Sequence, residues 1–206
     1  KNEKGWGTAS HFKFQIDRGK LLSQIELNKL KEYKRYLITP DGISPRVIPG
    51  MSGSLHQANS YEHSEDGHTT EDAFQRSQQV EKRNRKADTY LAQDFQTPVL
   101  FGDKNAPLTL ISWGSMKAPI LQALKQGYDR FNYLHFNHLW PMDKVKIRNI
   151  LLSIKKSLLV ENNSTAQLGQ LLTAVTGVDF SEKLLKYSGR PVYPEEILVK
   201  IKEIKL

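Results

Sequence analysis

The 206-residue sequence contains no cysteine, and no hydrophobic run in it approaches the roughly 20 apolar residues that a membrane-spanning helix needs. Without cysteine, these residues cannot form disulfides, thiolate metal sites or iron–sulfur ligands, and they offer no cysteine nucleophile. The glycine-rich loops G-x-G-x-x-G and G-x-x-x-x-G-K-[ST] are absent, and no serine stands in a G-x-S-x-G turn. Several enzyme classes are therefore excluded for this stretch of chain, and no membrane partner is expected.

Positive charge is in excess, with 30 Lys and Arg against 22 Asp and Glu, which gives a net charge of +8. Such a surplus can attract nucleic acid or an acidic electron carrier. The densest basic stretch, EKRNRKAD at 81–88, has no interleaved aromatic side chains on which bases could stack. We therefore expect a solvated basic surface and no nucleic-acid binding.

The chain begins at Lys1 with neither an initiator methionine nor an apolar signal region. We expect a segment cut from a longer protein, and removal of a tag is the alternative. A cytoplasmic location is expected.

Residues 1–97 are predicted to form a connecting arm of loops and one long helix. A short helix is expected within 21–33. The stretch 69–93 indicates a long helix, since two threonines can cap its start and acids precede bases along it. Its apolar residues are too sparse for a wide apolar stripe. We expect the arm to lie on protein outside this chain.

The loop PDGISPRVIPG at 40–50 contains three prolines and two glycines, a density that no helix or regular strand tolerates. We interpret it as a rigid loop that faces a neighbouring domain or subunit. Ser44 and Arg46 are its candidate contacts for a carboxylate or phosphate group. A salt bridge from Arg46 to another segment of the same chain is the alternative.

Residues 98–206 alternate between apolar strand patterns and helical patterns. The expected strands are 108–114, 131–141, 157–163 and 183–189, and the expected helices are 115–127, 143–154, 164–177 and 194–204. This alternation predicts an α/β domain whose open, mostly parallel sheet has helices on both faces.

Ligands of such sheets bind beyond the carboxyl ends of the strands. The candidate anion or interface contacts there are Ser115, Lys117, Glu161, Asn162 and Asn163. The alternative is that Ser115, together with Ser164 or Thr165, caps helices and that the two asparagines form turns. The loop YEHSEDGH at 61–68 mixes acids and histidines, but its spacing fits neither a His-x3-His pair nor a calcium loop, so no metal site is assigned.

Six separated blocks carry a resemblance to a known family. They are DGISPR (41–46), the stretch from YEHSEDGH to NRKAD (61–88), ISWGSMKAPILQAL (111–124), LWP (139–141), VENNSTAQLGQLL (160–172) and GRPVYPEEI (189–197). In this order they resemble the C-terminal part of the alpha subunit of 2-oxoacid:ferredoxin oxidoreductases, especially the 2-oxoglutarate type. The resemblance covers residues 17–197.

The resemblance implies an enzyme that oxidatively decarboxylates a 2-oxoacid with thiamine diphosphate and Mg²⁺. It passes electrons through a [4Fe–4S] cluster to ferredoxin and transfers the acyl group to coenzyme A. Residues 98–206 would be the domain similar to the transketolase C-terminal domain. The implied partners are the beta subunit, which holds the cluster, and the subunit's own N-terminal pyrimidine-binding domain.

The resemblance assigns no catalytic residue to this chain. The stretch YLITP at 36–40 imitates a motif of the missing pyrimidine-binding domain, but DGISPR follows it directly, so Thr39 receives no substrate role. We expect this segment to be structural, to bind no cofactor by itself and to be inactive in isolation. The alternative is a stand-alone α/β module that binds a small anionic ligand at the carboxyl edge of its sheet.

Overall fold

The computed structural model describes residues 16–127 and 130–205; the first residues of the chain, on which the expectation of a longer protein rests, lie outside this range. The chain divides into two compact units, Lys1–Asp88 and Thr89–Leu206. Within the described ranges, no helix has the length and apolar character that crossing a bilayer requires.

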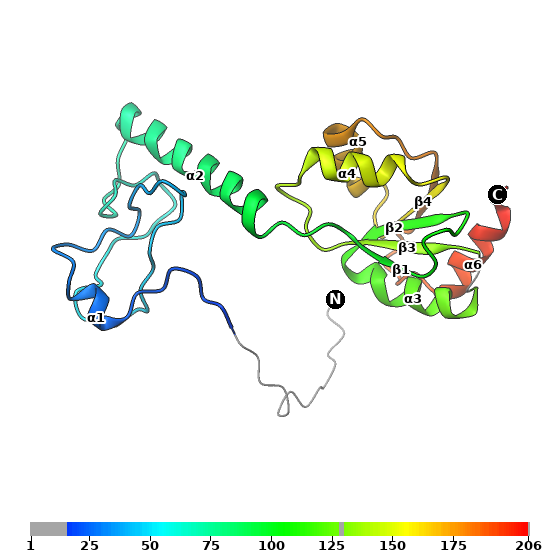
Figure 1. Cartoon of the computed structure of the whole chain (residues 1–206), viewed down its shortest axis with the longest axis horizontal. Helices are drawn as coiled ribbons and strands as arrows, with labels where there is room; N and C mark the ends of the chain where they lie inside the picture. Colours follow the sequence, from blue (N-terminus) through cyan, green and yellow to red (C-terminus); the bar gives the residue numbers. More distant parts are fainter. Residues whose placement is uncertain (1–15, 128–129, 206) are drawn as a thin grey trace, which may run out of the picture. The chain divides into compact units, whose positions relative to one another are not determined.

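The first unit contains the short helix α1 (Gln24–Leu27) and most of the long helix α2 (Ala73–Gln93), which continues into the second unit (Figure 1). Ser23 and Glu26 form a capping box at the start of α1. Helix α2 begins after Asp72, whose Oδ1 accepts a hydrogen bond from the backbone N–H of Gln75 at 2.8 Å. The expected threonine cap is therefore wrong, because the aspartate two residues after Thr70 supplies the acceptor.

The interior of the first unit is largely polar. Among its described residues, the buried hydrophobic side chains are Leu27 and Tyr33. Helix α2 instead buries Gln79 and Lys82, which donate to the Tyr36 carbonyl at 3.0 and 2.8 Å. This helix has no wide apolar stripe, as its sequence predicts, because its packed face is polar.

The second unit is built on a five-stranded sheet in the order β1-β3-β2-β4-β5. The strands are β1 (Val99–Phe101), β2 (Thr109–Trp113), β3 (Asn132–Phe136), β4 (Ser157–Glu161) and β5 (Glu182–Leu185). Strand β1 pairs antiparallel with β3, and the other three pairings are parallel. The predicted mostly parallel α/β sheet is confirmed, with β1 as an additional edge strand that the sequence did not reveal.

Helices cover both faces of this sheet (Figure 1). Helices α3 (Lys117–Gln126) and α6 (Pro194–Glu203) pack on one face, and α4 (Lys144–Leu152) and α5 (Gln167–Thr176) pack on the other. Neighbouring strand residues point to opposite faces. Leu110 therefore joins the core under α3 and α6, whereas Ile111 joins the core under α4 and α5. A strand buried on both sides reads as a continuous apolar run.

Candidate functional site

The loop at residues 40–50 packs tightly against α2 within the first unit. Gly42 is buried and has a φ of +74°. A Cβ atom at this position would lie 2.4 Å from the Lys82 carbonyl oxygen and 2.4 Å from the Lys86 nitrogen. Only glycine adopts this backbone conformation without strain and leaves room for the helix backbone. Gly42 therefore serves a contact inside the chain.

The two candidate side chains of the loop are held differently. The Ser44 hydroxyl donates to the Leu37 carbonyl at 2.8 Å and accepts a hydrogen bond from Lys82 Nζ at 3.1 Å. Arg46 is exposed, and its guanidinium donates to the Arg18 carbonyl. In the described part of the chain no carboxylate pairs with Arg46. The alternative of an ion pair within these residues is therefore wrong, and the guanidinium retains exposed donors.

The base of the loop is closed by further bonds to residues near the start of the described chain. The backbone of Arg46 pairs with Lys20 and Leu22, at 2.8 Å in each case. The ammonium of Lys20 also pairs with Asp41. This hydrogen bond, together with one from the Ile43 N–H, lowers the pKa of Asp41 to about 2. The loop is thus rigid for reasons that lie within this chain, in addition to any docking role.

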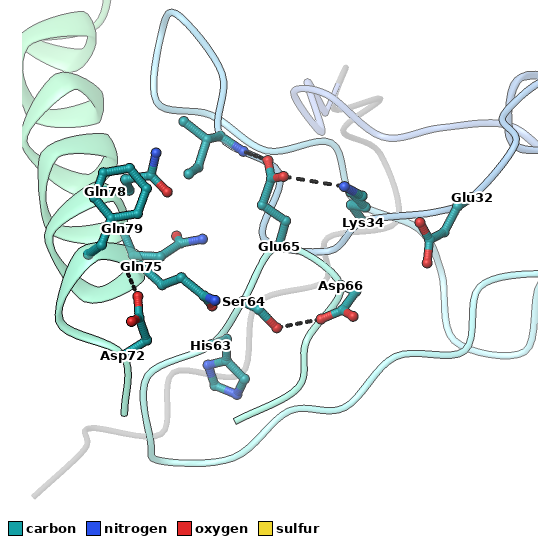
Figure 2. A pocket seen from close by; sticks show the side chains of 12 residues that line it. Glu32, Lys34, His63, Ser64, Glu65, Asp66, Asp72, Gln75, Gln78 and Gln79 are labelled. Atoms are coloured by element: carbon teal, nitrogen blue, oxygen red, sulfur yellow. Dashed lines mark hydrogen bonds and ion pairs between the residues drawn. The ribbon is translucent and has the colours of Figure 1, made fainter. Parts of the chain in front are cut away.

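A cavity of about 490 Å³ lies in the first unit beside α2 and the loop 63–66 (Figure 2). Figure 2 shows Glu65 reaching between two partners: its carboxylate accepts from the Ile38 N–H at 2.7 Å and from Lys34 Nζ at 3.3 Å. Asp66 accepts from the Ser64 hydroxyl and from His68, and these bonds hold the pKa of its carboxyl well below the usual range. The hydrogen bonds of these two carboxylates therefore hold the loop in its conformation.

The acid-and-histidine loop also contributes to the packing of the first unit. The imidazole of His63 is buried and stacks on the ring of Tyr36, with the ring centroids 4.2 Å apart. Residues 16–127 and 130–205 contain no group of three or more side chains placed to hold a metal ion. The cavity lining offers hydrogen bonds and packing and carries no recognisable catalytic constellation.

At the carboxyl edge of the sheet, Glu161 ends β4 and is fully buried, at 0% exposure. Its carboxylate accepts hydrogen bonds from the N–H groups of Leu168 and Gly169 at 3.0 and 3.1 Å, and from the Asn163 amide at 2.8 Å. It therefore satisfies the free N–H groups of the first turn of α5. This internal carboxylate takes the place that an external anion would occupy at the start of α5.

Asn163 is the second group that fixes this turn. Its Oδ1 accepts from the N–H groups of Thr165 and Gln167 at 3.1 and 3.3 Å. The expectation that Ser164 or Thr165 caps the helix is wrong, because the capping oxygens come from the end of the preceding strand and its turn. Asn162, the remaining candidate, is exposed.

The turn after β2 also differs from its expected form. Ser115 is exposed and lies in a 3-10 turn, Gly114–Met116, so it does not cap α3; the residue at the cap position is Met116. Lys117, the first residue of α3, is also exposed and places its ammonium 5.2 Å from the centre of the Phe101 ring. Ser115 and Lys117 therefore remain accessible at this edge of the sheet.

A buried hydrogen-bonded chain under α3 escaped the sequence analysis. The Ser112 and Tyr133 hydroxyls are 2.8 Å apart, and the Tyr133 hydroxyl lies 2.6 Å from Nδ1 of His135. Burial raises the pKa of Tyr133 to about 12, and burial together with the charge of Lys117 lowers the pKa of His135. The signal was present, since Tyr133 and His135 are two apart in a strand and share a face.

Comparison with known proteins identifies relatives for nearly the whole chain, although no family model matches it. The chain is 35% identical over 197 residues to 2-oxoacid:ferredoxin oxidoreductase 2, subunit alpha, of Aeropyrum pernix, covering 93% of this chain and 30% of the relative. It is 30% identical over 188 residues to the corresponding subunit 1 alpha of Sulfurisphaera tokodaii, covering 90% and 29%. The chain therefore spans less than a third of the length of these relatives.

A solved structure with a similar fold comes from an enzyme with a related name. The 2-oxoglutarate:ferredoxin oxidoreductase from Magnetococcus marinus, with 2-oxoglutarate, coenzyme A and succinyl-CoA bound, superposes with a TM-score of 0.69 at 26% identity. The match covers 85% of this chain and 31% of that chain.

Proposed function

We propose that this chain, which is homologous to part of the alpha subunit of 2-oxoacid:ferredoxin oxidoreductases, is a structural and interface segment of such an enzyme. The complete enzyme converts a 2-oxoacid, coenzyme A and oxidised ferredoxin into acyl-CoA, CO₂ and reduced ferredoxin. 2-Oxoglutarate is the substrate we favour, because the relative of solved structure has 2-oxoglutarate and succinyl-CoA bound.

The observation that carries an interface role is the balance of apolar surface in the first unit. Two of its described hydrophobic side chains are buried, whereas eight large ones are exposed, Leu55 at 98%. The exposed set is Ile16, Ile25, Leu30, Ile48, Leu55, Tyr61, Phe74 and Val80. A unit that buries so few apolar side chains has little hydrophobic driving force of its own, which supports packing against further protein. The remaining two thirds of the subunit and a beta subunit are the partners we propose.

The iron–sulfur cluster of the complete enzyme requires ligands that this sequence lacks. With no cysteine in the sequence, a [4Fe–4S] cluster takes its thiolate ligands from outside this chain. Following the resemblance, we assign thiamine diphosphate, its Mg²⁺ and the cluster to the pyrimidine-binding domain and the beta subunit, and this segment supplies contacts.

The proposal is tested by co-purifying the full-length alpha subunit with its beta subunit and measuring ferredoxin reduction with 2-oxoglutarate and coenzyme A. Arg46→Ala and Leu55→Asp change one exposed cation and one exposed apolar side chain of the first unit. Arg190→Ala is the control, because Arg190 is exposed in the second unit. We expect both test variants to reduce the yield of assembled enzyme several-fold. Assembly and turnover equal to those of the control in both variants would overturn the interface role. A wild-type complex that does not oxidise 2-oxoglutarate would overturn the assignment of 2-oxoglutarate as the substrate.

A further inference from the structure

The ammonium of Lys82 lies inside the first unit, where the residue is only 6% exposed. Its Nζ donates to the Tyr36 carbonyl at 2.8 Å and to the Ser44 hydroxyl at 3.1 Å. A lysine ammonium has three N–H donors. Within residues 16–127 and 130–205, the third donor has no hydrogen-bond acceptor.

No carboxylate neutralises this buried charge in the part of the chain that is described. None of the ion pairs there includes Lys82. The carboxylate of Glu65 favours the protonated form of Lys82, but its effect on the pKa is smaller than those of burial and of the neighbouring cations. The oxygens of Glu65 are already bonded to Lys34 and to the Ile38 N–H. Buried charges in proteins are normally paired, because an unpaired one is costly to remove from water.

Other cations surround Lys82 instead. The charges of Lys86, Arg35 and Arg83 all oppose its protonation. The guanidinium of Arg83 is held by both oxygens of Glu62, at 3.0 and 2.8 Å. Arg35 and Lys86 have no such partner among the described residues. Lys86 is exposed and Arg35 is half-buried. The Arg35 guanidinium carbon and the Lys82 Nζ lie 5.5 and 5.8 Å from the centre of the same Tyr36 ring, so these two cations are neighbours.

We propose that Arg35, Lys82 and Lys86 form a binding site for one compact oxyanion, a carboxylate or phosphate group, beside the loop at residues 40–50. An oxygen of the anion accepts a hydrogen bond from the third N–H of Lys82, and the negative charge of the anion offsets the positive charges around it. The loop positions the site, since Ser44 fixes the Lys82 ammonium and Gly42 lies against the α2 backbone between Lys82 and Lys86. This site goes beyond the proposed enzymatic role, and binding of a free anion to it does not depend on that role.

Protonation of Lys82 controls the affinity of this site. Burial, followed by the charges of Lys86, Arg35 and Arg83, lowers the pKa of Lys82 to about 8. An anion stabilises the ammonium form and therefore raises this pKa. Besides the three cations, the groups that face the ammonium are Glu65, the Tyr36 ring at 5.8 Å and the Ser44 hydroxyl.

Competitive acetylation read by mass spectrometry measures the pKa of each lysine from the pH at which it becomes reactive. The first arm compares the 206-residue chain with and without inorganic phosphate at constant ionic strength. The second arm compares the chain alone with the full-length alpha subunit assembled with its beta subunit in phosphate-free buffer. Lys104, an exposed lysine of the second unit, is the internal control.

We expect the pKa of Lys82 to rise by about one unit or more, which corresponds to about tenfold stronger binding of the anion to the protonated lysine. A rise with phosphate identifies a free anion as the occupant, and a rise on assembly alone identifies a protein carboxylate. The rise with phosphate should shrink in Lys86→Met, because one cation of the site is gone, and Lys104 should not move. A pKa of Lys82 that stays unchanged in both arms, or that rises equally in Lys86→Met, overturns the proposal.

Discussion

The substitution Gly42→Ala tests whether the loop at residues 40–50 is held against α2 as the structure describes. An added Cβ would lie 2.4 Å from two backbone atoms of α2, and the helix backbone cannot move aside as a flexible side chain can. Two costs follow. An alanine at a φ of +74° costs about 1–2 kcal/mol in backbone strain. The overlap with α2 adds about 1–3 kcal/mol, the usual cost of overpacking.

Gly53→Ala separates these two costs. Gly53 has a φ of +78° in the same unit, and nothing lies within 4 Å of the Cβ atom that alanine would add. It therefore carries the backbone strain without the overlap. The lower chain entropy of the unfolded alanine variant favours both proteins equally and cancels in the comparison.

Hydrogen exchange of the amides in residues 73–88 is the appropriate assay, because it reports the opening of α2 inside the first unit. A difference of about 1–3 kcal/mol predicts exchange about fivefold to 150-fold faster in Gly42→Ala than in Gly53→Ala. Equal exchange rates in the two variants would refute the packing of the loop on the helix and leave only the strain.

Three further predictions concern charged groups. Glu161→Gln should lower the free energy of unfolding of the second unit by about 2–3 kcal/mol, because two buried N–H groups lose a charged acceptor. Urea unfolding followed by tryptophan fluorescence measures this loss, with Asn162→Ala as a near-neutral control. Because the pKa of Asp41 is lowered, the bonds of its carboxylate contribute stability above pH 3.8, and this contribution is lost as the pH falls towards about 2. Asp41→Asn should remove this pH dependence from the hydrogen exchange of the loop amides. An unaltered dependence of the exchange on pH would contradict the assignment. The lysine at position 82 has a pKa of about 8 when folded and about 10.5 when unfolded, so the unfolded chain binds the proton more tightly between these values; the first unit should gain up to about 1.4 kcal/mol per pH unit as the pH rises from 8 to 10.5, and Lys82→Met should abolish that slope.

The α/β unit was predictable because the pattern of apolar residues in its sequence reflects which side chains are buried. Strands buried on both faces give continuous apolar runs such as LTLIS at 108–112, and the helices between them are amphipathic. The helix ends marked by Gly127 and Gly177 are confirmed as well. Strand β1 was missed because it has three residues and lies at the sheet edge with two of them exposed, so its pattern is too short to distinguish from a loop.

The candidate sites were harder to predict, because the bonding partners are distant in sequence or belong to the backbone. Glu161 is bonded to N–H groups seven and eight residues later, and nothing in its residue type separates such a cap from an anion contact. The basic stretch 81–88 was interpreted as a solvated surface. That interpretation is wrong for Lys82, which is buried because a backbone carbonyl and a hydroxyl replace part of its hydration.

The two units differ in whether apolar burial or hydrogen bonds hold them together. A buried leucine or phenylalanine side chain contributes about 1.5–3 kcal/mol, whereas a hydrogen bond inside a protein contributes a net of about 0.5–1.5 kcal/mol. The second unit buries two apolar clusters around its sheet, and the first unit is held mainly by bonds such as those from Gln79 and Lys82 to the Tyr36 carbonyl. Polar bonds specify the geometry of the first unit but supply little of the free energy that ordering its loops requires. Its exposed apolar side chains are therefore where contact with the rest of an enzyme would add the missing stability.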